Sequence, residues 1–279
     1  MKKIFLVVLL LSLFLTTHIF AQEKKANLLG LSIVEDILED DYGLTILDGL
    51  FSITIFKNLP ATDVFKVYSR WTGTGEHKVR VQIVDPDKKI IKKTNEENIK
   101  FENDYETYWF SHDFANTLFN KSGVYWVQAV LDDNVEFEMP LFIQISGEEL
   151  EYKPKSNLPY ITFSLPAIEV YEKDNGLLTV SGVFEYFAFE DFPAKDSFII
   201  ANGWCSGNGE FKQHIEILDP DNNIIYVSEP QYFENEPKTI NVVYDELEDF
   251  VFPKEGYYTV KVFLEDEPVL IYPIIVEKK

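Results

Sequence analysis

The sequence predicts an all-β protein built from two tandem antiparallel β-sandwiches. Three observations support this fold class. Almost the whole chain after residue 21 is an internal repeat, apolar and polar residues alternate in short runs, and no segment of this part has a persuasive 3.6-residue period. Many short alternating runs separated by Gly and Pro turns are typical of antiparallel sandwiches.

The repeat is visible at an offset of 133 residues. Residues 43–71 align with residues 176–204 with ten identities over 29 positions, and Trp71 coincides with Trp204 at the end of this block. One inserted residue then shifts the offset to 134, where residues 85–87 and 219–221 both read Asp-Pro-Asp. Because repeats of this length are complete structural units, the sequence predicts two copies of one domain.

The domain boundaries follow from the repeat and from a polar segment between its copies. We expect a first sandwich domain over residues 22–145 and a second over residues 160–279. Residues 146–159 contain Gly147, Pro154 and several acidic side chains, which is typical of a linker.

The first 21 residues have the pattern of a secretory signal peptide. Lys2 and Lys3 precede an apolar run over residues 4–15, and Ala21 offers a small residue for cleavage. The alternative is an uncleaved anchor, but the run is short against the ~20 residues that a spanning helix needs. We therefore expect an exported protein, whether periplasmic, secreted or at the cell surface, without a membrane span in the mature chain.

The strands of the first copy can be assigned in order. In residues 65–71 and 79–83 the odd-numbered positions, which are apolar except for Ser69, should face the core, and the glycine-containing residues 72–76 between them predict a hairpin. Residues 85–88 have the composition of a type I turn that leads into another strand. The last hairpin is predicted over residues 124–145 with its turn at 132–134, so that Trp126 points away from the core.

Composition excludes several functional classes. The chain carries 25 basic against 47 acidic side chains, a formal charge of -22, which disfavours nucleic acid as a partner because such binding needs clustered Lys and Arg. Cys205 is the only cysteine, so a disulfide framework is excluded. We expect Cys205 to be a buried or shielded small residue, with an intermolecular bridge as the alternative.

The motifs of the repeat resemble a family of uncharacterised bacterial immunoglobulin-like domains. The first copy carries them at Gly49, Phe51, Leu59-Pro60-Ala61 and Trp71, and then at Asp85-Pro86-Asp87, Gly123, Tyr125 and Pro140. This family usually has Gly after Asp-Pro-Asp, whereas this chain has Lys88 and Asn222. The resemblance implies two immunoglobulin-like sandwiches and supplies no function.

The residues that could support catalysis or bind a metal form no recognisable motif. We expect His77, His112 and His214 to be surface or strand-edge histidines, because no Ser/His/Asp or Cys/His grouping accompanies them. The chain is therefore expected not to be an enzyme and to need no cofactor or zinc. The acidic run that starts at Asp219 resembles a calcium loop, but Ile224 stands where that loop needs Gly, so a hairpin turn is the better interpretation.

The two arginines point to a binding surface. Arg70 and Arg80 both belong to the predicted first hairpin, on the face opposite its core. Symmetric pairing about Thr74 would set Tyr68 opposite Arg80 and Arg70 opposite Lys78, and Trp126 would extend this face if its strand joins the same sheet. The predicted binding residues are Tyr68, Arg70, Lys78, Arg80 and Trp126. The alternative is an exposed Tyr–Arg stack with a purely structural role.

The function expected from these observations is a binding or structural one. We expect an exported, non-enzymatic module of the bacterial cell envelope that binds another envelope or extracellular protein through a sheet face of the first domain, since Arg and aromatic side chains are common interface anchors. The alternative is a carbohydrate-binding module with Trp126, Tyr108 and Trp109 as stacking rings.

Overall fold

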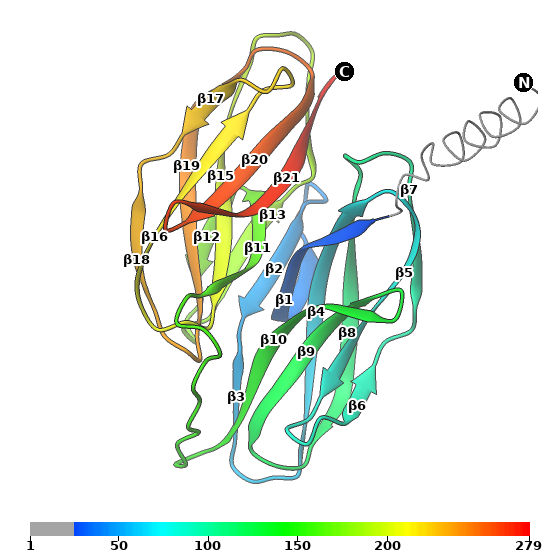
Figure 1. Cartoon of the computed structure of the whole chain (residues 1–279), viewed down its shortest axis with the longest axis vertical. Coiled ribbons are helices and arrows are strands. Elements are labelled where there is room, and N and C mark those ends of the chain that lie inside the picture. The colour runs from blue at the N-terminus through cyan, green and yellow to red at the C-terminus, as the bar shows by residue number, and fades with distance from the viewer. Residues whose placement is uncertain (1–24) are drawn as a thin grey trace, which may run out of the picture.

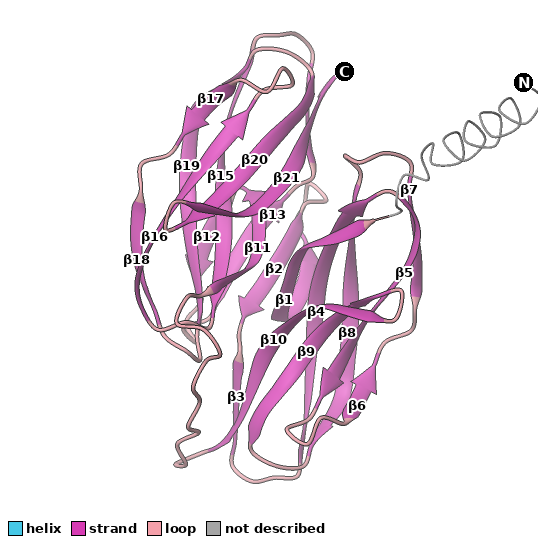
Figure 2. Cartoon of the chain, in the orientation of Figure 1, coloured by secondary structure: helices cyan, strands magenta, loops and turns pink. Residues whose placement is uncertain are grey.

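The computed structural model describes residues 25–279, and this part of the chain is all-β (Figure 2). The signal peptide predicted over residues 1–21 lies outside the described residues. Over residues 25–279 the structure contains no helix that is long and apolar enough to cross a membrane.

The described chain consists of two halves with the same order of strands, except that the first strand of the first half corresponds to two consecutive strands in the second (Figure 1). The first half contains β1 (Ala26–Glu39), β2 (Thr45–Leu50), β3 (Ile53–Phe56), β4 (Ala61–Gly73), β5 (Gly75–Val84), β6 (Ile90–Lys93), β7 (Glu97–Phe101), β8 (Thr107–Phe119), β9 (Gly123–Leu131) and β10 (Asn134–Ile145). The second half contains β11 (Tyr160–Ala167), β12 (Glu169–Glu172), β13 (Leu178–Val183), β14 (Tyr186–Phe189), β15 (Ala194–Cys205), β16 (Gly209–Leu218), β17 (Ile224–Val227), β18 (Gln231–Asn235), β19 (Ile240–Phe252), β20 (Gly256–Leu264) and β21 (Glu267–Lys278).

The strands form three sheets. One sheet of nine strands runs through both halves in the order β12-β13-β2-β1-β11-β15-β19, with β4 paired to β1 and β8 paired to β4. Each half adds a six-stranded sheet of its own, β3-β10-β9-β5-β6 with β7 on β5 in the first half, and β14-β21-β20-β16-β17 with β18 on β16 in the second. An apolar core in each half is built from residues of both the shared sheet and its own sheet.

The predicted alternation is confirmed by these cores. Phe65, Val67 and Trp71 of β4 are buried in the first core together with Val79 and other odd-numbered residues of β5. The last predicted hairpin is also confirmed, because β9 pairs antiparallel with β10 from Leu131 and Asn134 onward.

The predicted first hairpin is wrong. β4 pairs with β1 and β8, whereas β5 pairs with β6, β7 and β9. The short connection at Gly73–Thr74–Gly75 therefore carries the chain from one sheet to the other. Period-two alternation identifies the buried face of a strand, but it does not identify the neighbouring strand.

Equivalent turns of the two halves have matching backbone conformations. Lys88 and Asn222, which follow the two Asp-Pro-Asp turns, have φ values of 65° and 64°. Gly123 and Gly256 are required for a different reason, because a Cβ at either residue would lie 2.7 Å from the Cγ of the proline in the Asp-Pro-Asp turn of the same half. The turn therefore packs against the start of β9 in the first half and against the start of β20 in the second.

The two halves are joined along a local twofold axis. β1 pairs with β11 at Gly30 and Phe163, and β2 pairs with β13 at Leu47 and Val180. In each pair the two residues are equivalent members of the repeat, 133 positions apart in the chain. Antiparallel pairing of equivalent residues is the geometry of a twofold interface, and Figure 1 shows these strands at the centre of the molecule.

A third apolar cluster fills the junction between the halves. Its buried members are Val34, Leu47, Leu50, Tyr68, Phe163, Leu165, Ala167, Val180, Val183, Ile199 and Ala201. Because strands of both halves contribute to this cluster and to the nine-stranded sheet, the two repeats share buried apolar surface as well as backbone hydrogen bonds.

Candidate functional site

The five predicted binding residues do not form one surface. Tyr68 and Arg70 lie on β4 and are fully buried at the junction of the two halves. Lys78 and Arg80 lie on β5, and Trp126 lies on the neighbouring strand β9. The prediction that Tyr68 and Arg70 are exposed is therefore wrong, whereas the other three residues share the outer face of the first half's own sheet.

Arg70 is the centre of a buried interdomain ion pair. Its Nη2 atom donates to Oε2 of Glu185 in the second half at 2.5 Å, and the same oxygen accepts a hydrogen bond from Thr107 at 2.6 Å. The guanidinium also lies 5.4 Å from the ring centroid of Tyr272. Burial is the largest single effect and favours the neutral form of Arg70, but Glu185 together with Tyr68 and Tyr272 outweighs it, and the pKa of Arg70 is raised. This group links the halves and is inaccessible to a partner.

The burial of Arg70 depends on which residues face it across the strands. Arg70 is paired with Gly30 of β1, and the equivalent pair in the second half is Gly203 with Phe163. The Phe163 ring covers Gly203 so closely that a Cβ there would lie 2.2 Å from the ring. Each half thus combines one glycine with one large side chain at this position, and the large side chains occupy the junction.

Lys78 and Arg80 are neutralised by nearby carboxylates. Nη1 of Arg80 lies 3.1 Å from Glu96 and 2.8 Å from Asp133, and Nζ of Lys78 lies 3.5 Å from Glu96. The predicted basic patch is therefore a network of ion pairs, and exposed pairs of this kind contribute little to stability.

A chain of polar side chains crosses the outer face of the first half's sheet beside Trp126. The amide of Gln82 donates to Gln128 at 2.8 Å, and the amide of Gln128 donates to Glu138 at 3.0 Å. Lys155 from the segment between the halves donates to the other oxygen of Glu138 at 2.9 Å, and its ammonium lies 4.8 Å from the Trp126 ring centroid. We call Trp126, Gln128 and Glu138 the Trp126 cradle.

Of the residues of this cradle, only Trp126 is predicted from the sequence as a binding residue. The available signal was the alternation itself, because Gln128 is two residues from Trp126 on β9 and faces the same side. Glu138 is paired directly with Gln128 across β10. The contribution of Lys155 had no signal in the local pattern, since it depends on the path of the chain between the halves.

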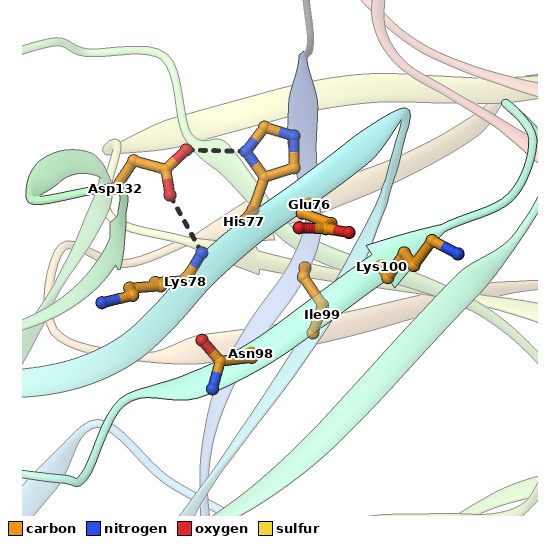
Figure 3. A pocket seen from close by; sticks show the side chains of 7 residues that line it. All are labelled: Glu76, His77, Lys78, Asn98, Ile99, Lys100 and Asp132. Atoms are coloured by element: carbon orange, nitrogen blue, oxygen red, sulfur yellow. Dashed lines mark hydrogen bonds and ion pairs between the residues drawn. The ribbon is translucent and has the colours of Figure 1, made fainter.

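A hollow of about 430 Å³ lies near Lys78, at the neighbouring strands β5 and β7. Figure 3 shows His77 and Asp132 at one side of it and Asn98 and Lys100 at the other. His77 Nδ1 lies 2.6 Å from Asp132, and its Nε2 lies 2.9 Å from the carbonyl oxygen of Thr74. A catalytic base needs a ring nitrogen directed at the substrate. Both ring nitrogens of His77 are already engaged by Asp132 and Thr74, so the His77–Asp132 pair does not have this arrangement.

Asp132 also stabilises the turn that carries it. Burial alone would raise the pKa of its carboxyl group, but hydrogen bonds from His77 and from the Lys78 N–H outweigh this effect and lower it. In the second half Glu265 accepts the corresponding bond from the N–H of Lys212 at 2.7 Å. The acidic side chain is therefore a structural feature of both repeats, whereas the histidine occurs only in the first.

The prediction that the histidines lie at the surface or at strand edges is wrong for His77, which is 6% exposed on β5 between β7 and β9. His112 lies on the edge strand β8, but its side chain is buried and only 5% exposed. Nε2 of His112 lies 2.8 Å from Oγ of Ser69, and burial lowers the pKa of His112 to about 4. This histidine is thus a neutral core residue at physiological pH.

The three rings predicted as a carbohydrate platform lie on different sheets. Tyr108 and Trp109 belong to β8 of the shared sheet, and Trp109 stacks on the buried Tyr68 at a centroid distance of 5.9 Å. Trp126 belongs to β9 of the other sheet. They do not form one stacking surface.

Two other sequence candidates have structural roles. Oδ1 of Asp219 accepts hydrogen bonds from the N–H groups of Asp221 and Asn223, which confirms the predicted turn. Cys205 is buried, as predicted, and burial raises the pKa of its thiol to about 12. A thiol in this state is unreactive.

Comparisons with known proteins identify a family but no function. The model of the family of unknown function DUF6941 matches residues 32–144 and again residues 164–277. No curated protein matches. Two solved structures are similar: dimeric latent PorU from Porphyromonas gingivalis, at 7% identity and a TM-score of 0.32, and a DUF4785 family protein from Legionella pneumophila, at 9% identity and a TM-score of 0.22.

The alignments with these two structures include 91% and 83% of this chain. They span 20% of the PorU chain and 56% of the Legionella chain.

Proposed function

The chain belongs to the DUF6941 family, whose function is unknown, and we propose that it is an exported, non-enzymatic binding module of the bacterial cell envelope. Its partner is an envelope or extracellular protein, which contacts the outer face of β5, β9 and β10 in the first half. The observation that carries this proposal is the Trp126 cradle, a partly exposed aromatic ring beside a carboxylate and an amide.

The difference between the two repeats supports this location. The positions of Trp126, Gln128 and Glu138 are occupied by Thr259, Lys261 and Ile271 in the second half, although the strand register is the same. The second repeat therefore forms the same pair of strands without this residue set. Aromatic side chains on an otherwise polar surface are common anchors of protein interfaces.

The proposal also includes the fold type of each repeat and the export of the chain. Each repeat is an immunoglobulin-like sandwich, supported by the hydroxyl groups of Tyr125 and Tyr258, which donate to the carbonyl oxygens of Lys121 and Lys254 four residues upstream. Such tyrosine corners are a hallmark of these sandwiches. Export is supported by the signal-peptide pattern of residues 1–21, and N-terminal sequencing of the natural protein tests for a start at Gln22.

The binding function is tested by capture from envelope fractions with the tagged chain. The variant Trp126→Thr plus Arg80→His places the second repeat's residues on the first repeat's face, so the fold should tolerate it. We expect the wild type to recover a partner that this variant loses.

The matched control is Thr259→Ala plus His214→Ala, which alters the equivalent face of the second half and should retain the partner. Equal recovery by wild type and the Trp126 variant would contradict the proposal.

A further inference from the structure

The geometry points to a specific ligand chemistry for the Trp126 cradle: it receives a lysine or arginine side chain from an extended basic segment of the partner, and Lys155 occupies it in the free protein. This inference rests on the proposed function, because it concerns the same face. It adds the chemical class of the partner and an internal competitor for the site.

The position of Lys155 shows what the cradle recognises. Its ammonium donates to Oε1 of Glu138 at 2.9 Å and lies 4.8 Å from the Trp126 ring centroid. A carboxylate beside an aromatic ring is a favourable environment for a cation, since the ring contributes a cation–π interaction within about 6 Å. Lys155 is therefore an internal example of the ligand.

The carboxylate of Glu138 is held in place and charged. The amide of Gln128 donates to Oε2 at 3.0 Å and leaves Oε1 for the cation, while Gln82 fixes the orientation of Gln128. Burial alone would raise the pKa of Glu138, but the hydrogen bonds from Gln128 and Lys155 outweigh it and lower the pKa below its usual range. The site is thus preorganised for a positive charge at neutral pH.

Lys155 is easily displaced from the cradle. Its side chain is 78% exposed, and it comes from residues 146–159, which contain no strand. Exposed ion pairs and cation–π contacts are individually weak. A cation on a partner that also contacts the surrounding sheet face would therefore compete successfully.

Charge complementarity favours a basic partner over other occupants. The chain carries a formal charge of -22, which attracts a basic segment over a long range and repels an acidic one. The second half does not reproduce the cradle, because Thr259 and Ile271 replace the ring and the carboxylate. Binding is therefore expected at one site per chain.

The test is a calorimetric titration of the mature chain with tetralysine amide at physiological ionic strength. Trp126→Thr removes the aromatic ring of the cradle. Because it changes no charge, it leaves the general electrostatic attraction intact. We expect Lys155→Ala to strengthen binding by about three- to tenfold, because the site is no longer occupied internally. Trp126→Thr and Glu138→Gln should each weaken binding by about fivefold or more.

Controls separate the cradle from unspecific attraction. Tetraglutamate should not bind, and Thr259→Ala in the second half should leave tetralysine affinity unchanged. Unchanged affinity in both Lys155→Ala and Trp126→Thr would overturn the inference. If capture from envelope fractions is lost in the Trp126 variant while tetralysine affinity is unchanged, the inference fails and the proposed function stands.

Discussion

The two repeats have the same strand order but place different polar groups at equivalent buried positions. Trp71 and Trp204 are both fully buried, yet Trp71 donates its indole N–H to Ser69, which contacts His112, whereas Trp204 donates to Gln213, whose amide reaches Asp245. His112 and Asp245 occupy equivalent positions on β8 and β19. Both repeats thus provide a hydrogen-bond acceptor for the core tryptophan, but the side chains that provide it differ between the two copies.

The same contrast occurs at the junction of the halves. Arg70 and Glu185 are a buried pair of opposite charges, and their equivalents in the other copies are Gly203 and Ser52. The backbone constraints of the repeat are therefore fixed by turns and cores, whereas its buried polar groups differ with their surroundings.

The largest expected effect is the loss of Arg70. Arg70→Gly introduces the residue of the second repeat and leaves Glu185 without its ion-pair partner, so the free energy of unfolding should fall by about 3–5 kcal/mol. Urea denaturation at pH 7 measures this change. The double variant Arg70→Gly plus Glu185→Ser should lose less than the sum of the single variants, and strict additivity would contradict a direct coupling.

The next effect is an opposite pH dependence of the two repeats. The folded pKa of His112 is lowered to about 4 by burial, so its contribution to stability is full above pH 6.5 and is lost as the pH falls toward 4. The folded pKa of Asp245 is raised to about 6 by burial, although hydrogen bonds from Ser228 and Gln231 oppose this. Its contribution is full below pH 3.8 and is lost as the pH rises through 6.

These two contributions should largely cancel in the wild type between pH 4 and pH 6.5. Each is worth up to about 3 kcal/mol. Relative to the wild type, His112→Gln should become more stable on acidification, and Asp245→Asn should become less stable. Denaturation midpoints at several pH values measure both slopes, and slopes of the same sign in the two variants would exclude this account.

A smaller and equal effect is expected at the tyrosine corners. Tyr125→Phe and Tyr258→Phe each remove one hydroxyl hydrogen bond to a backbone carbonyl, and Tyr258→Phe also removes a long hydrogen bond of 3.4 Å from the N–H of Lys254. Because this additional bond is long, the cost should be about 1 kcal/mol in either repeat. Thermal unfolding provides the measurement, with the exposed Tyr232→Phe as a control that should change nothing. A clear difference between the two corners would show that the repeats do not use this feature alike.

The smallest effect is expected at Arg80. Arg80→His introduces the residue of the second repeat and removes ion pairs to Glu96 and Asp133 whose carboxylates are largely exposed. The stability should change by about 0.5 kcal/mol or less, as measured by the same urea denaturation. If Arg80→His lowered the free energy of unfolding as much as Arg70→Gly does, ion pairs at the outer face would be as important for stability as the ion pair at the junction, which would contradict this prediction.

Much of the fold could be predicted from the sequence because the repeat and the alternation report local facts. The two copies, the inward face of β4 and β5, the last hairpin and the Asp-Pro-Asp turns all follow from residue spacing. Residue spacing does not show which strands lie side by side. The glycine-containing residues 72–76 therefore predict a hairpin, whereas in the structure the chain crosses there from one sheet to the other.

The candidate site was harder to predict for a related reason. Alternation places Tyr68 and Arg70 on the face opposite the first core, and it does not reveal that the second half covers this face. One signal was available in the aligned repeats, because Tyr68 and Arg70 correspond to Ala201 and Gly203. A large residue in one copy that is matched by a small one in the other is expected where these two faces pack in the same cluster, as Tyr68 and Ala201 do.

The twofold pairing of β1 with β11 and of β2 with β13 has a consequence for the origin of the chain. A surface that pairs with its own equivalent is what a single-repeat ancestor would need to form a homodimer. Joining the copies through residues 146–159 makes that association intramolecular and independent of concentration. Two joined copies do not need identical interface residues, and in this chain one copy supplies Arg70 and the other Phe163.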